Sequence, residues 1–284
     1  MYSEEVAKGD SMLEAIFLGI IQGLTEFLPI SSSAHLRIAG EFLPRAGDPG
    51  ATFTAITQIG TELAVLFYFR NDLKRIATSF FRSFARKELA AEERRDAKLG
   101  WLIIVGSLPI LVLGYLGQET IRTSFRSLWL VAVMLIVFGL ILGFLDWKRP
   151  SKRRLEDLSW SHGLLYGFAQ AMALVPGVSR SGATIAMGRL LGYERSEALR
   201  YSFLLAIPAV FASGFNELAE AITNPGGAFS LVETLMATFL AMLVGYAVIA
   251  WLMRYISTKS FAPFVIYRVI LGTAVLALLG AGVL

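Results

Sequence analysis

The sequence predicts an all-α polytopic membrane protein, with about six transmembrane helices and two helix–break–helix re-entrant hairpins in an inverted repeat. Three observations support this fold class. Of the 284 residues, 55% are apolar and 17% are charged, and the mean hydropathy is +0.61, which leaves too little charge to solvate a globular surface. Several apolar stretches reach the ~20 residues that cross a bilayer. Two longer apolar stretches carry a proline and a group of polar residues at their centres.

Six segments are predicted to be uninterrupted spans, because each is apolar over roughly the length of a bilayer. They are residues 52–69, 101–117, 128–147, 201–219, 231–253 and 261–284. The whole chain, 1–284, is interpreted as one membrane domain, in which the charged stretch 70–100 forms a cytoplasmic loop.

The remaining apolar segments, 12–43 and 161–192, are too long for one span and contain EFLPISSSAHLR and LVPGVSRSGAT at their centres. Proline, glycine and serine clusters interrupt a helix, and broken backbone at membrane depth persists only where protein or water satisfies it. Both segments are therefore predicted to be hairpins that enter and leave the membrane on the same side.

The two broken segments share a set of anchor residues, with a shift of one residue between the glutamine and the proline. The anchors are Gly19, Gln22 and Pro29 in the first segment and Gly167, Gln170 and Pro176 in the second. Because each broken segment is followed by a span, the sequence predicts two pseudo-repeat halves, about 12–117 and 161–253.

The distribution of basic residues predicts how the hairpins are oriented. Nineteen of the 26 lysines and arginines lie in residues 70–98, 148–154, 189–200 and 254–259, and cytoplasmic loops carry an excess of such residues. All four stretches are cytoplasmic only if neither broken segment crosses the membrane. The first hairpin then enters from the outer face and the second from the cytoplasmic face, so that their breaks meet near the midplane.

Ionisable and hydroxyl side chains gather at the two breaks: Glu26, Ser31, Ser32, Ser33, His35, Ser179, Arg180, Ser181 and Thr184. An ionisable residue at the bilayer centre costs roughly 2.5–3.5 kcal/mol on insertion scales, so such residues usually pair and have a function. A guanidinium, an imidazole, several hydroxyl groups and a helix N-terminus after each break favour binding of an anion, phosphate in particular.

Phosphoryl transfer requires mainly positioning and charge stabilisation, and four of these residues have predicted catalytic roles. Ser32 and His35 share one face of a helical turn, so His35 is interpreted either as the general base for Ser32 or as the nucleophile; the spacing permits both. Arg180 is predicted to neutralise the developing phosphoryl charge, and Glu26 to orient His35 or hold a cation. The predicted substrate-binding residues are Gln22, Ser31, Ser33, Ser179, Ser181 and Thr184.

Other polar residues have two interpretations each. Gln22 and Gln170 either satisfy broken backbone or touch substrate, and Glu62 and Arg268 either lie near the site or form helix–helix contacts. His162 is assigned to the membrane interface.

The composition also excludes several classes of function. The chain contains no cysteine, which excludes disulfides, thiolate metal sites and thiol catalysis. The basic residues lie between apolar spans, which indicates membrane topology rather than a nucleic-acid-binding face. No organic cofactor is expected.

These motifs resemble the undecaprenyl-diphosphate phosphatase family of bacterial inner membranes, which is associated with bacitracin resistance. The resemblance runs through nearly the whole chain and is strongest in QGLTEFLPISSSAH (22–35) and PGVSRSGAT (176–184), with support from QIGTELAV (58–65), SFLLAIPA (202–209) and FAPFVIYR (261–268). It implies hydrolysis of C55 polyprenyl diphosphate to the monophosphate, which recycles the lipid carrier for peptidoglycan. It also implies interdigitated hairpins with a pocket that opens to the outer, periplasmic face.

The resemblance carries over residue by residue. The family's glutamate motif falls on Gln22 and Glu26, its serine–histidine motif on Ser31, Ser32 and His35, and its arginine motif on Ser179, Arg180, Ser181 and Thr184. Members are often reported to depend on a divalent cation, Mg²⁺ or Ca²⁺. Because position 22 is glutamine here, a cation at Glu26 lacks a second carboxylate and is expected to need the diphosphate oxygens of the substrate as ligands.

Two other functions were weighed against the enzyme. A transporter or flippase of an anionic polyprenyl lipid has the same architecture of inverted repeats, but simple binding does not need a serine–histidine pair. A type-2 phosphatidic acid phosphatase needs two histidines in its site, and His162 is in the wrong setting. The glycine-rich end LGTAVLALLGAGVL (271–284) indicates close helix packing, either within one chain or in a homodimer.

Overall fold

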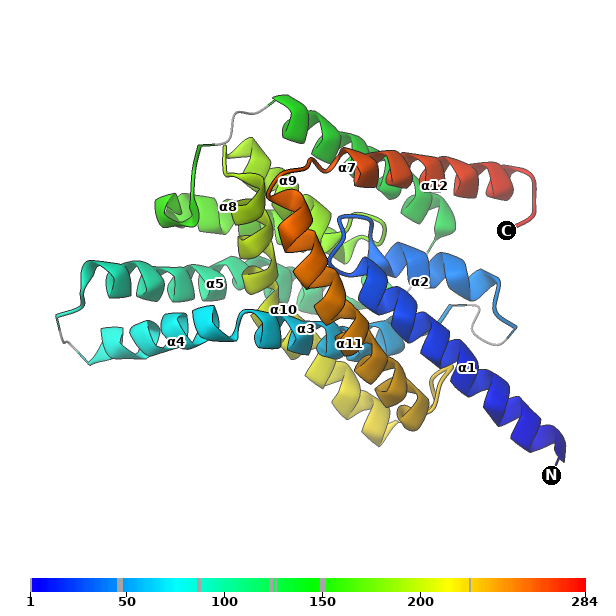
Figure 1. Cartoon of the computed structure of the whole chain (residues 1–284). Coiled ribbons are helices and arrows are strands. Elements are labelled where there is room, and N and C mark those ends of the chain that lie inside the picture. Colours follow the sequence, from blue (N-terminus) through cyan, green and yellow to red (C-terminus); the bar gives the residue numbers. More distant parts are fainter. Residues whose placement is uncertain are drawn as a thin grey trace.

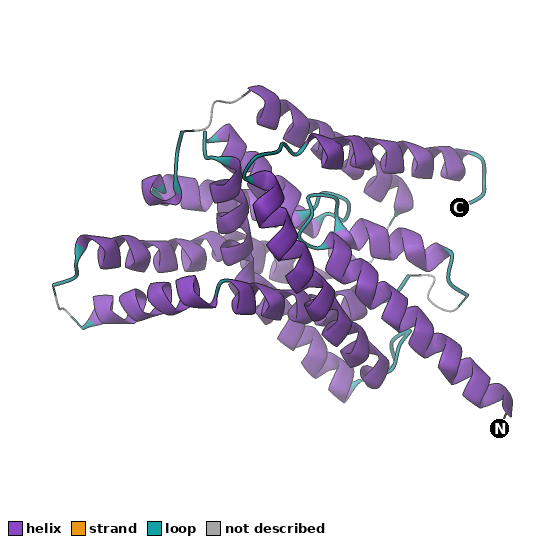
Figure 2. Cartoon of the chain, in the orientation of Figure 1, coloured by secondary structure: helices purple, strands orange, loops and turns teal. Residues whose placement is uncertain are grey.

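The computed structural model describes residues 2–44, 48–85, 88–122, 125, 127–148, 152–224 and 226–284, without the side chains of 2–10 and 122. These residues form helices joined by turns, with no β-strand among them (Figures 1 and 2). The helices are α1 (Tyr2–Thr25), α2 (Ser32–Glu41), α3 (Gly50–Tyr68), α4 (Arg70–Phe84), α5 (Ala91–Leu116), α6 (Gln118–Arg122), α7 (Leu128–Lys148), α8 (Trp160–Ala171), α9 (Arg180–Leu190), α10 (Arg195–Thr223), α11 (Leu231–Ile256) and α12 (Ala262–Gly280), with short 3-10 helices at Leu155–Asp157 and Met172–Leu174.

Five of the described helices are long and apolar enough to cross a membrane, judged by length and composition: α5, α7, α10, α11 and α12. They coincide with five of the six predicted spans. The sixth prediction, residues 52–69, does form a helix, α3, but its polar side chains, among them Gln58 and Glu62, leave it outside this group.

Both broken segments fold as two α-helices joined by a break in the α-helical backbone, which in the second segment begins with the 3-10 helix Met172–Leu174. The first turn separates α1 from α2, and the second separates α8 from α9. Figure 1 shows the two turns meeting near the middle of the molecule, where Ser181 Oγ donates a hydrogen bond to the Leu28 carbonyl at 3.1 Å. The breaks therefore contact each other, as the sequence predicts.

The repeated glycines Gly19 and Gly167 have the same task in the two halves. Helix α1 packs on α11, and α8 packs on α5. A Cβ on Gly19 would lie 2.5 Å from the Ala237 carbonyl oxygen on α11, and one on Gly167 would lie 2.4 Å from the Gly106 carbonyl oxygen on α5. Glycine is required for such close approach of two helix backbones. Each anchor thus marks where a broken segment contacts a helix of the other half.

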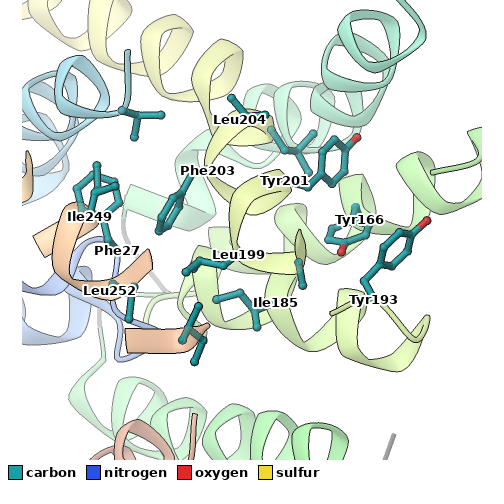
Figure 3. Close-up of a cluster of buried hydrophobic side chains, with 14 of the residues drawn as sticks. Phe27, Tyr166, Ile185, Tyr193, Leu199, Tyr201, Phe203, Leu204, Ile249 and Leu252 are labelled. Atoms are coloured by element: carbon teal, nitrogen blue, oxygen red, sulfur yellow. The ribbon is translucent and has the colours of Figure 1, made fainter. Parts of the chain in front are cut away.

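A cluster of buried apolar side chains supports the first break (Figure 3). Phe27, in the turn between α1 and α2, packs edge-on against Phe203 of α10, with 5.2 Å between the ring centroids. Leu252 and Ile249 of α11 belong to the same cluster. Because Phe27 directly follows Glu26, its burial fixes the turn that carries the carboxylate.

The charged segment 70–100 is largely helical, and residues 86 and 87 lie outside the described part. Helix α4 and the start of α5 run side by side (Figure 1). Arg75 Nε lies 2.6 Å from Asp96 Oδ2, and Arg82 forms an ion pair with Glu93. These pairs join two amphipathic stretches that the sequence alone shows only as a run of charges.

Asp146, near the end of α7, joins three further elements. Its Oδ1 lies 3.0 Å from Arg189 Nε in α9 and 2.7 Å from Arg195 Nε at the start of α10. Its Oδ2 accepts a hydrogen bond from the Phe261 N–H, just before α12, at 3.2 Å. One buried carboxylate therefore fixes α9 and α12 relative to α7.

Candidate active site

Each break ends on a serine in a strained backbone conformation. Ser31 (φ 74°) precedes α2 and Ser179 (φ 71°) precedes α9, and within the described residues these two are the non-glycine positions with positive φ. A positive φ costs a residue with a side chain roughly 1–2 kcal/mol, and such strain gathers at functional sites. The two broken segments thus place a strained serine at the same point, immediately before a helix N-terminus.

Glu26 is the centre of the hydrogen-bond network at the breaks. Its buried carboxylate accepts hydrogen bonds at Oε2 from Gln22 Nε2 at 2.8 Å and from Ser32 Oγ at 2.5 Å. Its Oε1 accepts from Arg180 Nη2, also at 2.5 Å. Gln58 Nε2 on α3 lies 3.5 Å from Oε2. The carboxylate therefore links α1, α2, α3 and α9.

The second break reaches the site through Arg180 and its neighbours. Ser179 Oγ accepts a hydrogen bond from the Gly182 N–H at 3.1 Å and so caps α9. Ser181 Oγ donates across to the first break. Nη1 of Arg180 is buried and has no hydrogen-bond partner among the described residues. Of the two terminal nitrogens of the guanidinium, one is thus bound by Glu26 and the other lacks an acceptor there.

Ser32 and His35 do not pair in the way the sequence predicts. Ser32 Oγ donates to Glu26, while His35 Nδ1 lies 2.7 Å from the Ser31 carbonyl oxygen and His35 Nε2 lies 2.7 Å from the Tyr267 hydroxyl. Because a carbonyl oxygen only accepts, Nδ1 carries the proton of the neutral ring and Nε2 accepts from Tyr267. The base that contacts Ser32 is thus Glu26. The sequence predicts that Glu26 orients His35, but its carboxylate binds Ser32 instead.

Arg268 on α12 ties the two breaks to each other. It is fully buried, and at 2.8–3.2 Å its guanidinium donates to five backbone carbonyls, those of Pro29, Met134, Leu135, Gly177 and Val178. A broken helix leaves carbonyls without intrahelical donors, and Arg268 supplies donors to both breaks and to α7. Arg268 therefore lies beside the site, and its role there is to donate hydrogen bonds to backbone carbonyls.

Ser33 and Thr184, both predicted to bind substrate, lie in different surroundings in the structure. Ser33 Oγ lies 3.3 Å from Ser31 Oγ at the start of α2. Thr184 points away from the first break, with its Oγ1 2.5 Å from Ser202 Oγ on α10 and 2.8 Å from the Arg180 carbonyl oxygen. Thr184 is thus placed to hold α9 against α10.

The glutamines of the two repeats differ in their partners. Gln22 donates to the Glu26 carboxylate rather than to broken backbone, whereas both polar side-chain atoms of the buried Gln170 lack a hydrogen-bond partner in the described part of the chain. The second histidine, His162, binds the Tyr193 hydroxyl through Nδ1 at 2.7 Å, and burial lowers its pKa. It takes no part in the hydrogen bonds around Glu26.

The structure adds Gln58 and Tyr267 to the site, and it places Glu62, for which the sequence left two interpretations open, beside Arg180. Gln58 and Glu62 lie four positions apart on α3 and so on one face, and Glu62 Oε2 is 3.7 Å from Arg180 Nη2. An amide and a carboxyl group one turn apart in the apolar stretch QIGTELAV were the sequence signal for this pair. Tyr267 gives no such signal, because its contact with His35 depends on how α12 packs beside α2.

The site is closed in this structure. A cavity of about 10 Å³ lies between Glu26, Glu62 and Arg180. Such a volume holds one water molecule at most, and it is far smaller than a diphosphate group. A diphosphate group therefore does not fit into this cavity as the structure has it.

The protein groups at Glu26 do not form a complete metal site. Within the described residues, no group of three or more histidine, aspartate or glutamate side chains is placed to hold a metal ion. Both oxygens of Glu26 already accept hydrogen bonds from side chains. A divalent cation here would need most of its six or more oxygen ligands from another source.

Comparison with known proteins shows a match along almost the whole chain. Residues 15–274 match the family described as "Bacitracin resistance protein BacA". The chain is 59% identical to an "Undecaprenyl-diphosphatase" of Micrococcus luteus, over 96% of this chain and 98% of that protein. It is 58% identical to "Undecaprenyl-diphosphatase 2" of Agrobacterium fabrum, over 96% and 97%, and 54% identical to an "Undecaprenyl-diphosphatase" of Thermobifida fusca, over 96% and 92%.

Proposed function

The chain belongs to the bacitracin resistance protein BacA family, and we propose that its two broken segments form the catalytic site of an undecaprenyl-diphosphatase. The enzyme is a multi-pass membrane phosphatase, which hydrolyses undecaprenyl diphosphate to undecaprenyl phosphate and inorganic phosphate. This reaction returns the lipid carrier to peptidoglycan synthesis and confers bacitracin resistance.

The observation that carries this proposal is the ion pair between Glu26 and Arg180 at the junction of the two breaks. Charged side chains within a membrane are usually paired and mark functional sites. The start of α2 offers a second contact for an anion, because Ser31 makes no side-chain capping hydrogen bond and the first N–H groups of the helix remain available. A diphosphate between Arg180 and this helix end has a cation and N–H donors around it.

Ser32 is the nucleophile of this reaction. Binding of the diphosphate draws Arg180 from Glu26 to the terminal phosphoryl group, where the guanidinium stabilises the developing charge. Glu26 is 2.5 Å from Ser32 Oγ and takes the hydroxyl proton as Oγ attacks the terminal phosphorus. The bond between this phosphorus and the bridging oxygen breaks, and undecaprenyl phosphate leaves with the electron pair.

His35 serves the second step, the hydrolysis of the phosphoserine. Its Nε2 bears the lone pair and is now bound by the Tyr267 hydroxyl. The attacking water gives its proton to Nε2, and Glu26 returns its proton to Ser32 Oγ as inorganic phosphate leaves. The two bases thus act on two different proton transfers.

The two broken segments are re-entrant hairpins of an inverted repeat, and the site opens to the outer face. Three features support this topology: the paired glycine contacts of α1 and α8, the paired strained serines, and the concentration of basic residues in four stretches of the chain. Cytoplasmic placement of all four stretches requires that neither hairpin crosses.

Glu26 is the side chain at the site that would hold a divalent cation, Mg²⁺ or Ca²⁺, and the remaining ligands would come from the substrate. Such an ion would add positive charge beside the phosphoryl group. Within the chain itself, Arg180 stabilises the developing charge. The hydrogen-bond network around Glu26 positions the reacting groups.

The first test is phosphate release from C55 polyprenyl diphosphate by the purified protein in detergent, beside Arg180→Ala and with and without EDTA. We expect release by the wild type and none by a folded Arg180→Ala protein. Absence of release by a monodisperse wild type in any cation would refute the phosphatase assignment and favour transport or flipping of the lipid.

A second test identifies the nucleophile. A substrate labelled in the terminal phosphate, quenched during turnover, should leave label on Ser32, and phosphoserine survives acid whereas phosphohistidine is rapidly hydrolysed. Acid-labile label on His35, or full turnover by Ser32→Ala, would assign the attack to His35 instead.

A further inference from the structure

Glu62 places a carboxyl group at a fully buried position of α3, where an apolar side chain would be expected. It lies within α3 and is 0% exposed, and neither of its oxygens accepts a hydrogen bond from a described residue. A buried carboxyl group without a donor destabilises a fold, and an apolar side chain of similar size would often stabilise it. The residue therefore needs an explanation other than stability.

The surroundings of Glu62 provide that explanation. It shares the lining of the 10 Å³ cavity with Glu26 and Arg180, and Arg180 is the one cationic residue of that lining. Nη2 of Arg180 lies 2.5 Å from Glu26 Oε1 and 3.7 Å from Glu62 Oε2. One guanidinium thus stands between two carboxyl groups, one in the first break and one on α3.

The two carboxyl groups differ in what else holds them. Glu26 also accepts hydrogen bonds from Gln22 and Ser32, so it has a second task in the reaction. The bound diphosphate draws Arg180 away from Glu26, and once Glu26 receives the Ser32 proton it is neutral and attracts the guanidinium only weakly. Glu62 has no such second task, and it remains opposite Arg180 throughout.

We propose that Glu62 is a positioning residue, which keeps the Arg180 guanidinium beside the phosphoryl group while Glu26 carries the serine proton. The inference rests on the proposed phosphatase function and deepens it. It explains why a carboxyl group with no hydrogen-bond donor is buried in α3, since its partner is a side chain that moves during the reaction.

The test uses two replacements of Glu62 and a matched control on the same helix. Glu62→Leu removes both acceptor oxygens at similar size, and Glu62→Gln keeps one. Thr57→Val is the control, because Thr57 is also fully buried in α3 and its Oγ1 bonds only to carbonyls of that helix, those of Phe53 and Thr54. Each protein is measured for kcat, KM and the midpoint of thermal unfolding in detergent.

We expect Glu62→Leu to unfold at or above the wild-type temperature, while kcat falls about 10- to 100-fold, the effect of a misplaced catalytic group. KM should stay within about twofold, because the loss lies in the chemical step. Glu62→Gln should recover most of kcat, since its amide oxygen still accepts from the guanidinium, and Thr57→Val should match the wild type.

Three outcomes overturn the inference while leaving the phosphatase function intact: wild-type kcat in Glu62→Leu, a loss of kcat in Glu62→Leu that comes with a lower unfolding temperature, or a Glu62→Gln protein no more active than Glu62→Leu. A wild type that releases no phosphate instead overturns the proposed function, and this inference with it.

Discussion

Replacing Arg268 should destabilise both breaks at once. In Arg268→Met the three carbonyls that it binds at the breaks, those of Pro29, Gly177 and Val178, lose their donor, whereas the carbonyls of residues 134 and 135 lie inside α7 and keep their intrahelical donors. A buried acceptor left without a partner costs about 1–3 kcal/mol, and removal of a buried charge returns part of the total. The net loss should be about 4–5 kcal/mol, the size seen when a buried network is broken. Arg268→Lys should lose about half as much, because an ammonium group has three donors.

The assay is thermal unfolding of the detergent-solubilised protein, followed by tryptophan fluorescence. For a chain of about this size, each kcal/mol of lost stability lowers the midpoint of unfolding by about 2–4 °C. Arg268→Met should therefore unfold about 10–15 °C below the wild type. Arg70→Met is the control, since Arg70 is exposed and donates to one carbonyl, that of Phe67. An Arg268→Met protein that unfolds at the same temperature as the wild type but releases no phosphate would contradict the reasoning. Arg268 would then act on the substrate rather than on the backbone.

Four further predictions follow from the site. Arg180→Lys should lower kcat about 10²- to 10³-fold without loss of fold, since an ammonium group cannot reproduce the planar guanidinium; near-normal kcat would contradict this. Tyr267→Phe should make His35 react faster with diethyl pyrocarbonate, measured by mass spectrometry of the peptide, because Nε2 loses its partner; an unchanged rate would refute the assigned tautomer. Gly167→Leu should lower the unfolding temperature or the yield, because its side chain meets the Gly106 backbone, whereas the exposed Gly280→Leu should not. EDTA should reduce phosphate release and Mg²⁺ or Ca²⁺ should restore it; equal rates in both would refute the proposed cation.

The parts of the fold that depend on local chemistry were predictable from the sequence. Proline and serine inside apolar segments locate both breaks, because few other features interrupt an apolar helix at that depth. The anchors Gly19 and Gly167 could be matched from spacing alone, and each proves to be a point of close backbone approach. The predicted span 52–69 is a helix, but the polar face that gives it Gln58 and Glu62 makes it less apolar than the other spans.

The parts that depend on packing between distant segments were not predictable. Ser32 and His35 share a helical turn, and local spacing cannot show that Glu26, before the helix, reaches Ser32 first. The Ser31 carbonyl and Tyr267 then hold the imidazole elsewhere. Which acceptors Arg268 serves likewise follows from the position of α12 and not from its sequence.

The two broken segments use the same backbone conformation to place two different chemical groups. Ser31 and Ser179 have nearly the same backbone angle at the same point of each hairpin, so the residues that follow, Ser32 and Arg180, occupy equivalent helix positions. Both donate to Glu26 at 2.5 Å, one as a hydroxyl group and one as a guanidinium. The residue equivalent to Glu26, four positions after Gln170, is leucine, so the carboxylate exists in one half only. Similar backbone turns therefore bring the proposed nucleophile, Ser32, its proposed base, Glu26, and the cationic Arg180 to one point, and the difference in sequence between the two broken segments supplies the groups that the proposed reaction needs.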